Sequence, residues 1–287
     1  KMSIIFVSHE LNLVSKFTNK IIVLFNGNIV ESGMSSKILS NPKQQYTKML
    51  IRSIIPKNMR PLRLPTIDNK LKKFPIATKK GRQKRHHKLY NSNPILQIKE
   101  LNFSYQNNNI LNCISFNLYK GETLGLVGES GSGKSTISKC ILGINDYING
   151  EIIYNKRNIK LIAPKIFRKN VQLIFQDPFS SLNPEMKIGD SILEPMNVHK
   201  IFKKSERKNE AIKLLEDVGL KKEDFHKYPT QFSGGQRQRI VIARALSVKP
   251  EIIICDESVS ALDVSVQSQV LNLLNDLKDT YSITLLF

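Results

Sequence analysis

Tryptophan is absent from this chain of 287 residues, and cysteine is scarce. The three cysteines, Cys113, Cys140 and Cys255, lie far apart and form no Cys-x-x-Cys pair. That spacing excludes a disulfide framework or a thiolate metal site and fits a reducing compartment. No run approaches the roughly 18 apolar residues that cross a bilayer, so no membrane-spanning helix is predicted. Residues 1–10 lack the layout of a signal peptide. With 40% apolar residues the chain can bury a large core, and its length predicts about two domains.

Acidic residues are almost missing from residues 56–93. This stretch holds twelve Lys and Arg against one acid, Asp68, so it carries a charge of +11 out of the chain's +20. Its prolines and its lack of a helical or alternating period predict a linker over 56–94, extended by proline and self-repulsion. Two interpretations stay open. The linker is either a solvated tether, His86 and His87 included, or a tether that touches anionic lipid headgroups or RNA.

The two ends of the sequence repeat one pattern. Lys1–Phe6 reads K-M-S-I-I-F, and Ser282–Phe287 reads S-I-T-L-L-F. This predicts two copies of one unit, with only the tail of the first and all but the tail of the second. Residues 21–25 and 29–30, joined by Asn26-Gly27, predict a hairpin in the first copy. A permuted arrangement is the alternative, in which Ser3–Ser8 and Ile283–Phe287 would compete for one place in a sheet.

A glycine-rich segment follows the apolar residues 123–127, which predict a strand. It satisfies the pattern G-x-x-x-x-G-K-[ST], and a helix is expected from there to Leu142. Glycines let the backbone fold around an anion with its N–H groups inward, and the helix N-terminus adds positive potential. Lys134 is predicted to reach the β- and γ-phosphates, and the Ser135 hydroxyl to bind Mg²⁺. The predicted cradle comprises Gly128, Glu129, Ser130, Gly131, Ser132, Gly133, Lys134, Ser135 and Thr136.

Two adjacent carboxylates follow residues 252–255, an apolar run typical of a strand buried on both faces. Open α/β sheets bind ligands at the carboxyl ends of such strands. Asp256 is therefore predicted to hold Mg²⁺ through water, and Glu257 to polarise the water that attacks the γ-phosphate. An exposed acidic turn is the alternative, and the phosphate cradle argues against it.

The segment Phe232-Ser-Gly-Gly-Gln236 precedes a long helical pattern. Ser233 can cap that helix, and the glycines leave its first amides bare, so the segment suits a phosphate supplied by a different domain. It resembles the signature motif of ABC ATPases, with Phe232 where Leu is usual. The resemblance implies an α/β fold of the P-loop NTPase class, with a mixed sheet core, an antiparallel β subdomain and a helical subdomain. It also implies nucleotide contacts for Ser233, Gly234, Gly235 and Gln236.

The same resemblance assigns further roles residue by residue. Tyr105 matches the aromatic residue that stacks on adenine, with a strand-surface aromatic as its alternative. Gln176 matches the glutamine that touches Mg²⁺ and the attacking water and links the site to the transport subunit. Ser260–Asp263 matches the loop that crosses between paired domains, and Asp263 is counted among the nucleotide contacts. His9 matches the switch histidine of the other copy, with a structural role as the alternative. Ser258 stands where Pro is usual.

Gln176–Pro184 and Asn41–Lys48 resemble the oligopeptide, dipeptide, nickel and glutathione importer branch, in its form with two fused ATPase domains. This predicts a first-domain tail over 1–55, the linker over 56–94, and a second domain lacking its tail over 95–287. It implies a subunit that binds and hydrolyses ATP with Mg²⁺ to import a peptide-like substrate. Its partners would be permease subunits, a second ATPase domain and, only indirectly, a substrate-binding protein. Its place would be peripheral, on the cytoplasmic face of the inner membrane. Nucleic acid is not an expected partner, but a tandem ABC ATPase acting on the ribosome is the alternative function, supported by the basic linker.

Overall fold

The computed structural model describes residues 4–8, 14, 16–25, 27–52, 61–66, 76–106, 108–260 and 262–287. The chain divides into two compact units. One comprises residues 1–79 with 262–272, and the other comprises residues 80–261 with 273–287. The glycine-rich loop and the acidic pair both belong to the second unit.

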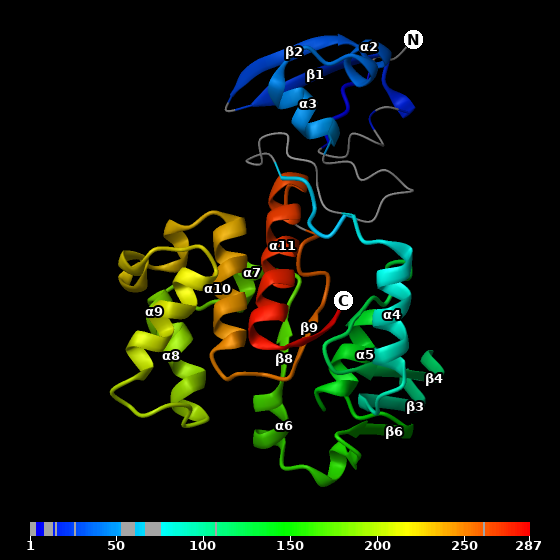
Figure 1. Cartoon of the computed structure of the whole chain (residues 1–287), viewed down its shortest axis with the longest axis vertical. Helices are drawn as coiled ribbons and strands as arrows, with labels where there is room; N and C mark the ends of the chain where they lie inside the picture. Colours follow the sequence, from blue (N-terminus) through cyan, green and yellow to red (C-terminus); the bar gives the residue numbers. More distant parts are fainter. Residues whose placement is uncertain are drawn as a thin grey trace. The chain divides into compact units, whose positions relative to one another are not determined.

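The first unit is built on the predicted hairpin (Figure 1). Strands β1 (Lys20–Phe25) and β2 (Asn28–Met34) pair antiparallel, and Gly27 supplies the turn with φ +76°. Helices α2 (Ser35–Ser40) and α3 (Gln45–Arg52) follow. Because strand side chains alternate, Ile21 and Val23 pack with Ile38 of α2 while Ile22 and Leu24 are exposed.

The second unit has a parallel sheet at its centre, with strand order β5-β10-β9-β8. Its strands are β5 (Thr123–Leu124), β8 (Val171–Ile174), β9 (Ile252–Cys255) and β10 (Thr284–Leu286). All four residues of β9 are buried, as the apolar run predicts. The predicted strand over 123–127 is assigned only at its start. The Leu126 N–H nevertheless donates to the Phe287 carbonyl, so the backbone stays beside β10 up to the glycine-rich loop.

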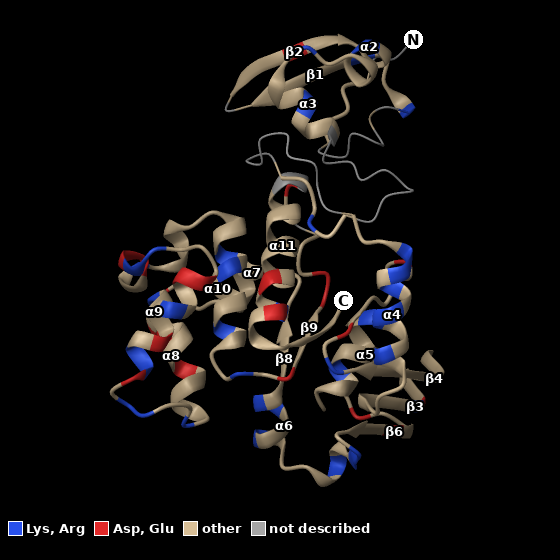
Figure 2. Cartoon of the chain, in the orientation of Figure 1, with Lys and Arg blue, Asp and Glu red and all other residues tan. Residues whose placement is uncertain are grey.

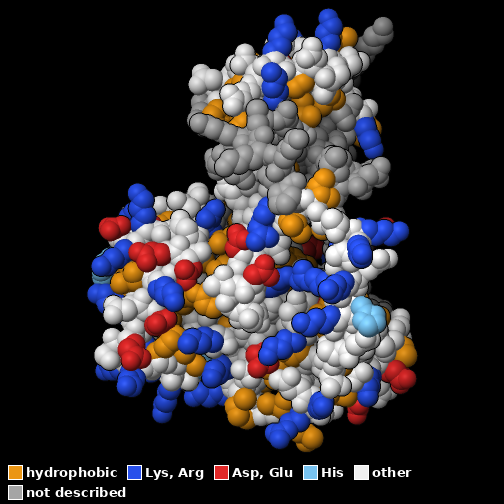
Figure 3. Space-filling model, viewed as in Figure 1, with side chains coloured by type: hydrophobic (Ala, Val, Ile, Leu, Met, Phe, Trp, Pro, Cys, Tyr) orange, Lys and Arg blue, Asp and Glu red, His pale blue; other side chains and the backbone are white. Residues whose placement is uncertain are grey.

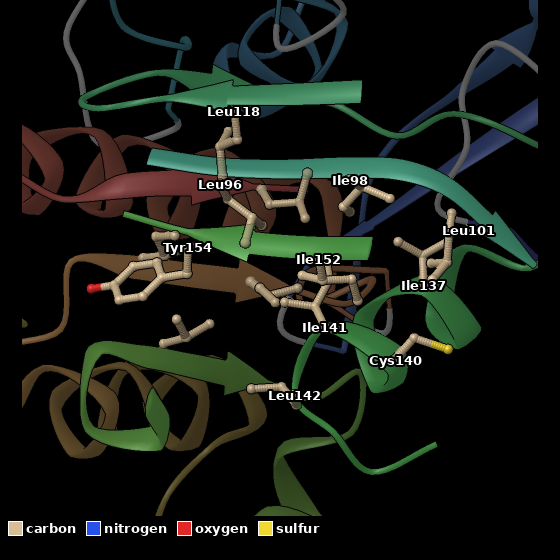
Figure 4. Packing of buried hydrophobic residues seen from close by; sticks show 14 of the residues in the cluster. Leu96, Ile98, Leu101, Leu118, Ile137, Cys140, Ile141, Leu142, Ile152 and Tyr154 are labelled. Carbon is tan, nitrogen blue, oxygen red and sulfur yellow. The ribbon is translucent and has the colours of Figure 1, made fainter. Parts of the chain in front are cut away.

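A second, antiparallel sheet has the order β4-β3-β6-β7. Its strands are β3 (Pro94–Tyr105), β4 (Asn108–Tyr119), β6 (Asn149–Tyr154) and β7 (Arg157–Asn158). Helix α5 (Lys134–Ile141) packs between the two sheets in one apolar cluster. Figure 4 shows this cluster, in which Ile98 and Ile152 of the antiparallel sheet lie with Ile141 of α5. The packing fixes where the helix begins, and so it fixes the loop before it.

Helices form a separate group beside the parallel sheet (Figure 1). The prediction of helical structure over 177–231 is confirmed, and the helix marked by Ala211 and Leu215 ends before Gly219, whose φ is +77°. The α-helices of this group are α7 (Pro178–Ser181), α8 (Ile188–Val198), α9 (Arg207–Asp217) and α10 (Gly234–Leu246). Its 3-10 turns are η2 (Lys222–His226) and η3 (Pro229–Gln231). The 3-10 turn η1 (Ile159–Leu161) and helix α6 (Pro164–Asn170) instead pack with the core cluster of the two sheets. Helix α11 (Val264–Tyr281) runs through residues of both units and precedes β10, as its apolar spacing predicts.

The extended conformation expected for the whole linker is wrong in its second half. Residues 79–90 form the helix α4 (Lys79–Tyr90), which has no buried residue. Between Pro75 and Pro94 the segment has no proline, and Lys, Arg, Gln and Leu are good helix formers. The sequence pattern did not predict this helix, because α4 has no apolar face and therefore no hydrophobic repeat of helical period.

The repeated end segments have different structures. Residues 4–7 form no strand and are exposed, whereas β10 holds a place between β5 and β9. The two copies therefore do not share one strand position in this structure.

Candidate active site

The glycine-rich loop connects β5 to α5, and three of its glycines allow its shape. Gly131 and Gly133 have φ of +82° and +95°, a region that side chains disfavour. A Cβ on Gly128 would lie 2.5 Å from the Ser132 Oγ. The Lys134 Nζ donates to the carbonyls of Gly128 (2.9 Å) and Glu129 (2.8 Å), so the ammonium lies within the curve of the loop. The loop therefore presents a positive charge beside the bare amides that begin α5.

The acidic pair lies against this loop. Asp256 follows the last residue of β9, and its Oδ1 accepts a hydrogen bond of 2.8 Å from the Ser135 hydroxyl. The Glu257 Oε1 lies 3.8 Å from the Lys134 Nζ. The Glu257 Oε2 accepts a hydrogen bond of 2.9 Å from the Gln176 amide. The structure thus brings together five residues that the sequence placed up to 123 positions apart, and it does not support an isolated acidic turn.

Two oxygen groups meet at this point, the Ser135 hydroxyl and the Asp256 carboxylate, and the Gln176 amide lies beside them through its contact with Glu257. Hydroxyl, carboxylate and amide oxygens are of the hard type that Mg²⁺ prefers. In the described ranges there is no group of three or more His, Cys, Asp and Glu side chains, so protein carboxylates alone would not form a complete cage. Burial raises the pKa of Cys255, the residue before Asp256, to about 12, so this thiol stays neutral and is not a metal ligand of the thiolate type. The donor set suits an ion that takes its other ligands from phosphates and water.

The signature segment has the predicted local structure. Ser233 caps α10, accepting from the Gln236 N–H (3.4 Å), and the Gln236 side chain accepts from the Ser233 N–H (3.0 Å). Phe232 is buried. Ser233 and Gln236 are exposed, and Gly234 and Gly235 open the helix. These residues lie on a different element from the glycine-rich loop, so their role as nucleotide contacts stays a prediction.

Three other predicted residues are less constrained. Tyr105 ends β3 with 52% of its side chain exposed, and its ring packs edge-on against Phe103. The surface interpretation and the adenine-stacking interpretation therefore both stay open. Asp263 is exposed just before α11. His9 lies outside the described residues.

The sequence did not predict a cavity in the helical part. Its volume is about 520 Å³, and it is lined by Phe179, Ser180, Ser181, Leu182, Asn183, Pro184, Met186, Ser191, Glu194 and Arg244. Asp177 caps the short α7 through the N–H groups of Phe179 and Ser180, and this shapes one wall. Arg244 of α10 closes the other side by donating to the Ser181 carbonyl (2.8 Å).

Nearer its own start, helix α10 also contacts the segment Gln176–Pro184. The Arg237 guanidinium lies 4.0 Å from the centre of the Phe179 ring and donates to the Pro229 carbonyl. The helix that carries the signature therefore holds the wall of the cavity at two points, Arg237 and Arg244. Sequence spacing gave no signal for these long-range contacts.

The loop, the acidic pair and the parallel sheet define an α/β domain of the P-loop nucleotide-binding class. Solved ABC proteins share this fold. CbiO1 from Clostridium perfringens, part of the ABC transporter complex cbiONQ, superposes with a TM-score of 0.62 at 26% identity, over 68% of this chain and 78% of that one. The ATP-binding cassette MJ0796, in a dimeric structure bound to ADP and Pi, gives a TM-score of 0.59 at 27% identity, over 67% of this chain and 86% of that one.

Residues 111–260 match the family described as ABC transporter. Glutathione import ATP-binding protein GsiA of Escherichia coli (strain K12) is 38% identical over 307 residues, which is all of this chain and 48% of that protein. GsiA of Shigella flexneri is 38% identical over 306 residues with the same coverage. This chain belongs to the ABC transporter family, so the resemblance seen in the sequence is confirmed. It spans about half the length of the curated relatives that it matches.

Proposed function

We propose that this chain binds and hydrolyses ATP to power import of a peptide-like substrate through a membrane permease. The main support is the convergence of Lys134, Ser135, Gln176, Asp256 and Glu257 in one place. Relatives named as glutathione import ATP-binding proteins support the direction of transport. They favour import over the alternative of a tandem ATPase acting on the ribosome.

The chemistry follows from the positions of these side chains. Loop amides and the Lys134 ammonium bind the phosphates of ATP, because a charged donor within the loop neutralises their charge. Ser135, Asp256 and Gln176 would hold Mg²⁺, which supplies charge neutralisation between the phosphates when it is bound. In this scheme Glu257 accepts a proton from the attacking water, and its hydrogen bond from the Gln176 amide supports that role by orienting the carboxylate.

A second ATPase domain would complete the site. Ser233–Gln236 present the capped start of α10, which suits the phosphates of a nucleotide bound to a facing domain. The dimeric form of MJ0796 supports such a pairing. We assign residues 1–55 to the tail of a first ATPase domain, 56–94 to a linker and 95–287 to a second domain. The facing domain would belong either to the same full-length protein or to another copy.

The cavity beside α7 fits the permease. It is open to a partner side chain or helix end, and Gln176 lies on the same loop as its wall, two residues before α7. A permease element seated there would move the glutamine that contacts Glu257. The described part of the chain contains no helix long and apolar enough to cross a membrane. Because the relatives are named as import ATP-binding proteins, we place the chain peripherally, on the cytoplasmic face of the inner membrane, with a substrate-binding protein contacting only the permease.

Titration with a fluorescent ATP analogue and Mg²⁺ tests nucleotide binding. Replacing Lys134 by Ala removes a charge-assisted contact, and we expect the affinity to fall by about 10- to 100-fold. Lys139→Ala, an exposed change on the same helix, is the matched control and should bind as the unchanged chain does. Equal affinities for the two variants would contradict the assignment of the loop.

A further inference from the structure

The basic helix α4 has no role in the proposed ATPase cycle. It contains six Lys and Arg and no acid in twelve residues, the basic positions being Lys79, Lys80, Arg82, Lys84, Arg85 and Lys88. None of its residues is buried. Figure 2 shows the basic residues along α4, and Figure 3 shows Lys and Arg side chains on the surface in the same region. Lys79, Lys80, Lys84, Arg85 and Lys88 are exposed and Arg82 is partly exposed, so the helix carries a local concentration of positive charge at the surface.

This charge is fixed to the ATPase domain at one end of the helix. The Tyr90 hydroxyl donates to Glu122 Oε1 (2.9 Å), and its ring meets the edge of Tyr119 at 5.1 Å between centroids. Glu122 is buried, and its other oxygen accepts from the Tyr119 N–H (2.9 Å). The Ser92 N–H and hydroxyl both donate to the Leu89 carbonyl and close the last turn. The helix thus leaves the domain from a defined anchor.

The charges on α4 repel one another. Lys80, Lys84 and Lys88 are spaced four apart and so lie along one face, where like charges destabilise a helix. In the first turn no acid offsets them. A dense layer of negative charge beside that face would relieve the repulsion and hold the helix by attraction. The apolar side chains give α4 no face that could insert into a hydrophobic partner.

We propose that α4 is a docking surface for anionic phospholipid headgroups. The choice of a bilayer rests on the proposed transport function, which keeps the chain beside a membrane. RNA fits less well, because residues 79–89 of α4 contain no Phe, Tyr or Trp on which a base could stack. The Tyr90 ring is engaged by Tyr119 and His86, and the His87 ring contacts the Asn91 side chain. Attraction of this kind grows with the number of basic residues near the surface and weakens with salt.

Co-sedimentation of the full chain with lipid vesicles tests the surface. One set contains phosphatidylglycerol and phosphatidylcholine, and the other contains phosphatidylcholine alone. The chain should bind the anionic vesicles at least about tenfold more strongly, and added salt should remove the preference. The variant K80Q/K84Q/R85Q/K88Q should lose at least about tenfold of this binding, since Gln keeps helix propensity and removes the charge.

A matched variant removes the same charge elsewhere. K203Q/K204Q/K213Q/K222Q changes exposed lysines of the helical part and should keep the binding of the unchanged chain. Equal loss in both variants would overturn the proposal, because it would reflect net charge alone. No preference for anionic vesicles would also overturn it. Tighter binding to polyuridylate than to anionic vesicles at the same salt would overturn the lipid assignment in favour of RNA.

Folding and ATP binding are checked separately. Circular dichroism and titration with MgATP should give the same result for both variants as for the unchanged chain. The reason is that α4 has no buried residue and supplies no residue of the proposed nucleotide site. Vesicle binding requires neither ATP nor a permease. A failed vesicle experiment with normal ATP binding would therefore reject the surface and leave the proposed ATPase function standing.

Discussion

The side chain and backbone of Glu257 are held in place by a few individual contacts. Its φ of +47° lies in the left-handed region, which costs a non-glycine residue about 1 kcal/mol or more. The turn follows directly on the buried strand β9 and directs the carboxylate back toward the loop. The Gln176 amide holds one oxygen, and the Lys134 ammonium lies near the other. The Ser260 hydroxyl and N–H both donate to the Glu257 carbonyl, which holds the backbone in this conformation.

Replacing Glu257 by Gln should separate binding from hydrolysis. The amide keeps the size of the side chain but cannot accept a proton from water, so hydrolysis should fall by roughly two orders of magnitude or more while ATP binding is retained. Phosphate release and titration with a fluorescent ATP analogue measure the two properties. Glu216→Gln, an exposed change on α9, is the control. Near-normal turnover in the Glu257 variant would refute its role as the base.

At the scale of elements, the antiparallel sheet supports the helix that follows the loop. Strand β6 approaches its antiparallel neighbour β3 closely at Gly150, opposite the register shift between Lys99 and Asn102, and the φ of Gly150 is +102°. A Cβ there would lie 2.5 Å from the Glu100 carbonyl oxygen and 2.6 Å from that of Lys99, and both atoms are backbone. Ile98 of β3 and Ile152 of β6 pack in the cluster that contains α5. A change in the spacing of these strands would therefore shift α5, and with it the glycine-rich loop that precedes this helix.

Gly150→Ala should destabilise the ATPase domain by more than about 2 kcal/mol, because the strands must separate and the residue must keep an unfavourable φ. Urea unfolding followed by circular dichroism measures the change. Gly125→Ala is the control, since a Cβ there meets no atom within 4 Å and its φ is not left-handed. Equal unfolding midpoints for the two variants would show that the close approach of β6 to β3 does not require a glycine at position 150.

For the whole molecule, the proposal that two domains share each nucleotide site has a kinetic consequence. The loop 128–136 leads into α5 and the signature 233–236 begins α10, and we propose that each signature serves the nucleotide of a facing domain. If the site is shared in this way, a single ATPase domain binds ATP alone and must associate with another to hydrolyse it quickly.

Phosphate release at saturating MgATP should therefore rise per chain as the chain concentration increases. The measurement covers dilute to concentrated protein at constant salt, with the Glu257→Gln variant as the background. Substantial turnover that does not depend on concentration would contradict the shared site.

Several local features were predictable because they depend on neighbours in the sequence. The hairpin at Gly27, the buried strand β9, the end of α9 before Gly219 and the Ser233 cap all follow from short-range patterns. The helix α4 was missed because it has no apolar period. The cavity was missed because Arg237 and Arg244 reach residues about 60 positions earlier, and such pairing leaves no periodic signal.

The sequence alone determined which groups can handle a nucleotide, since glycines, a lysine, hydroxyls and carboxylates at fixed spacing are set by the chemistry of phosphate and Mg²⁺. Only the tertiary structure decided that Gln176 and Glu257 meet, and that Asp256 accepts from Ser135. The first contact arises because β8 and β9 are parallel neighbours, so residues that follow the two strands emerge at the same edge of the sheet. The second arises because β5, which leads into the loop before Ser135, lies parallel in the same sheet, with only β10 between it and β9. Strand order is a property of the packed core, and no local spacing contains it.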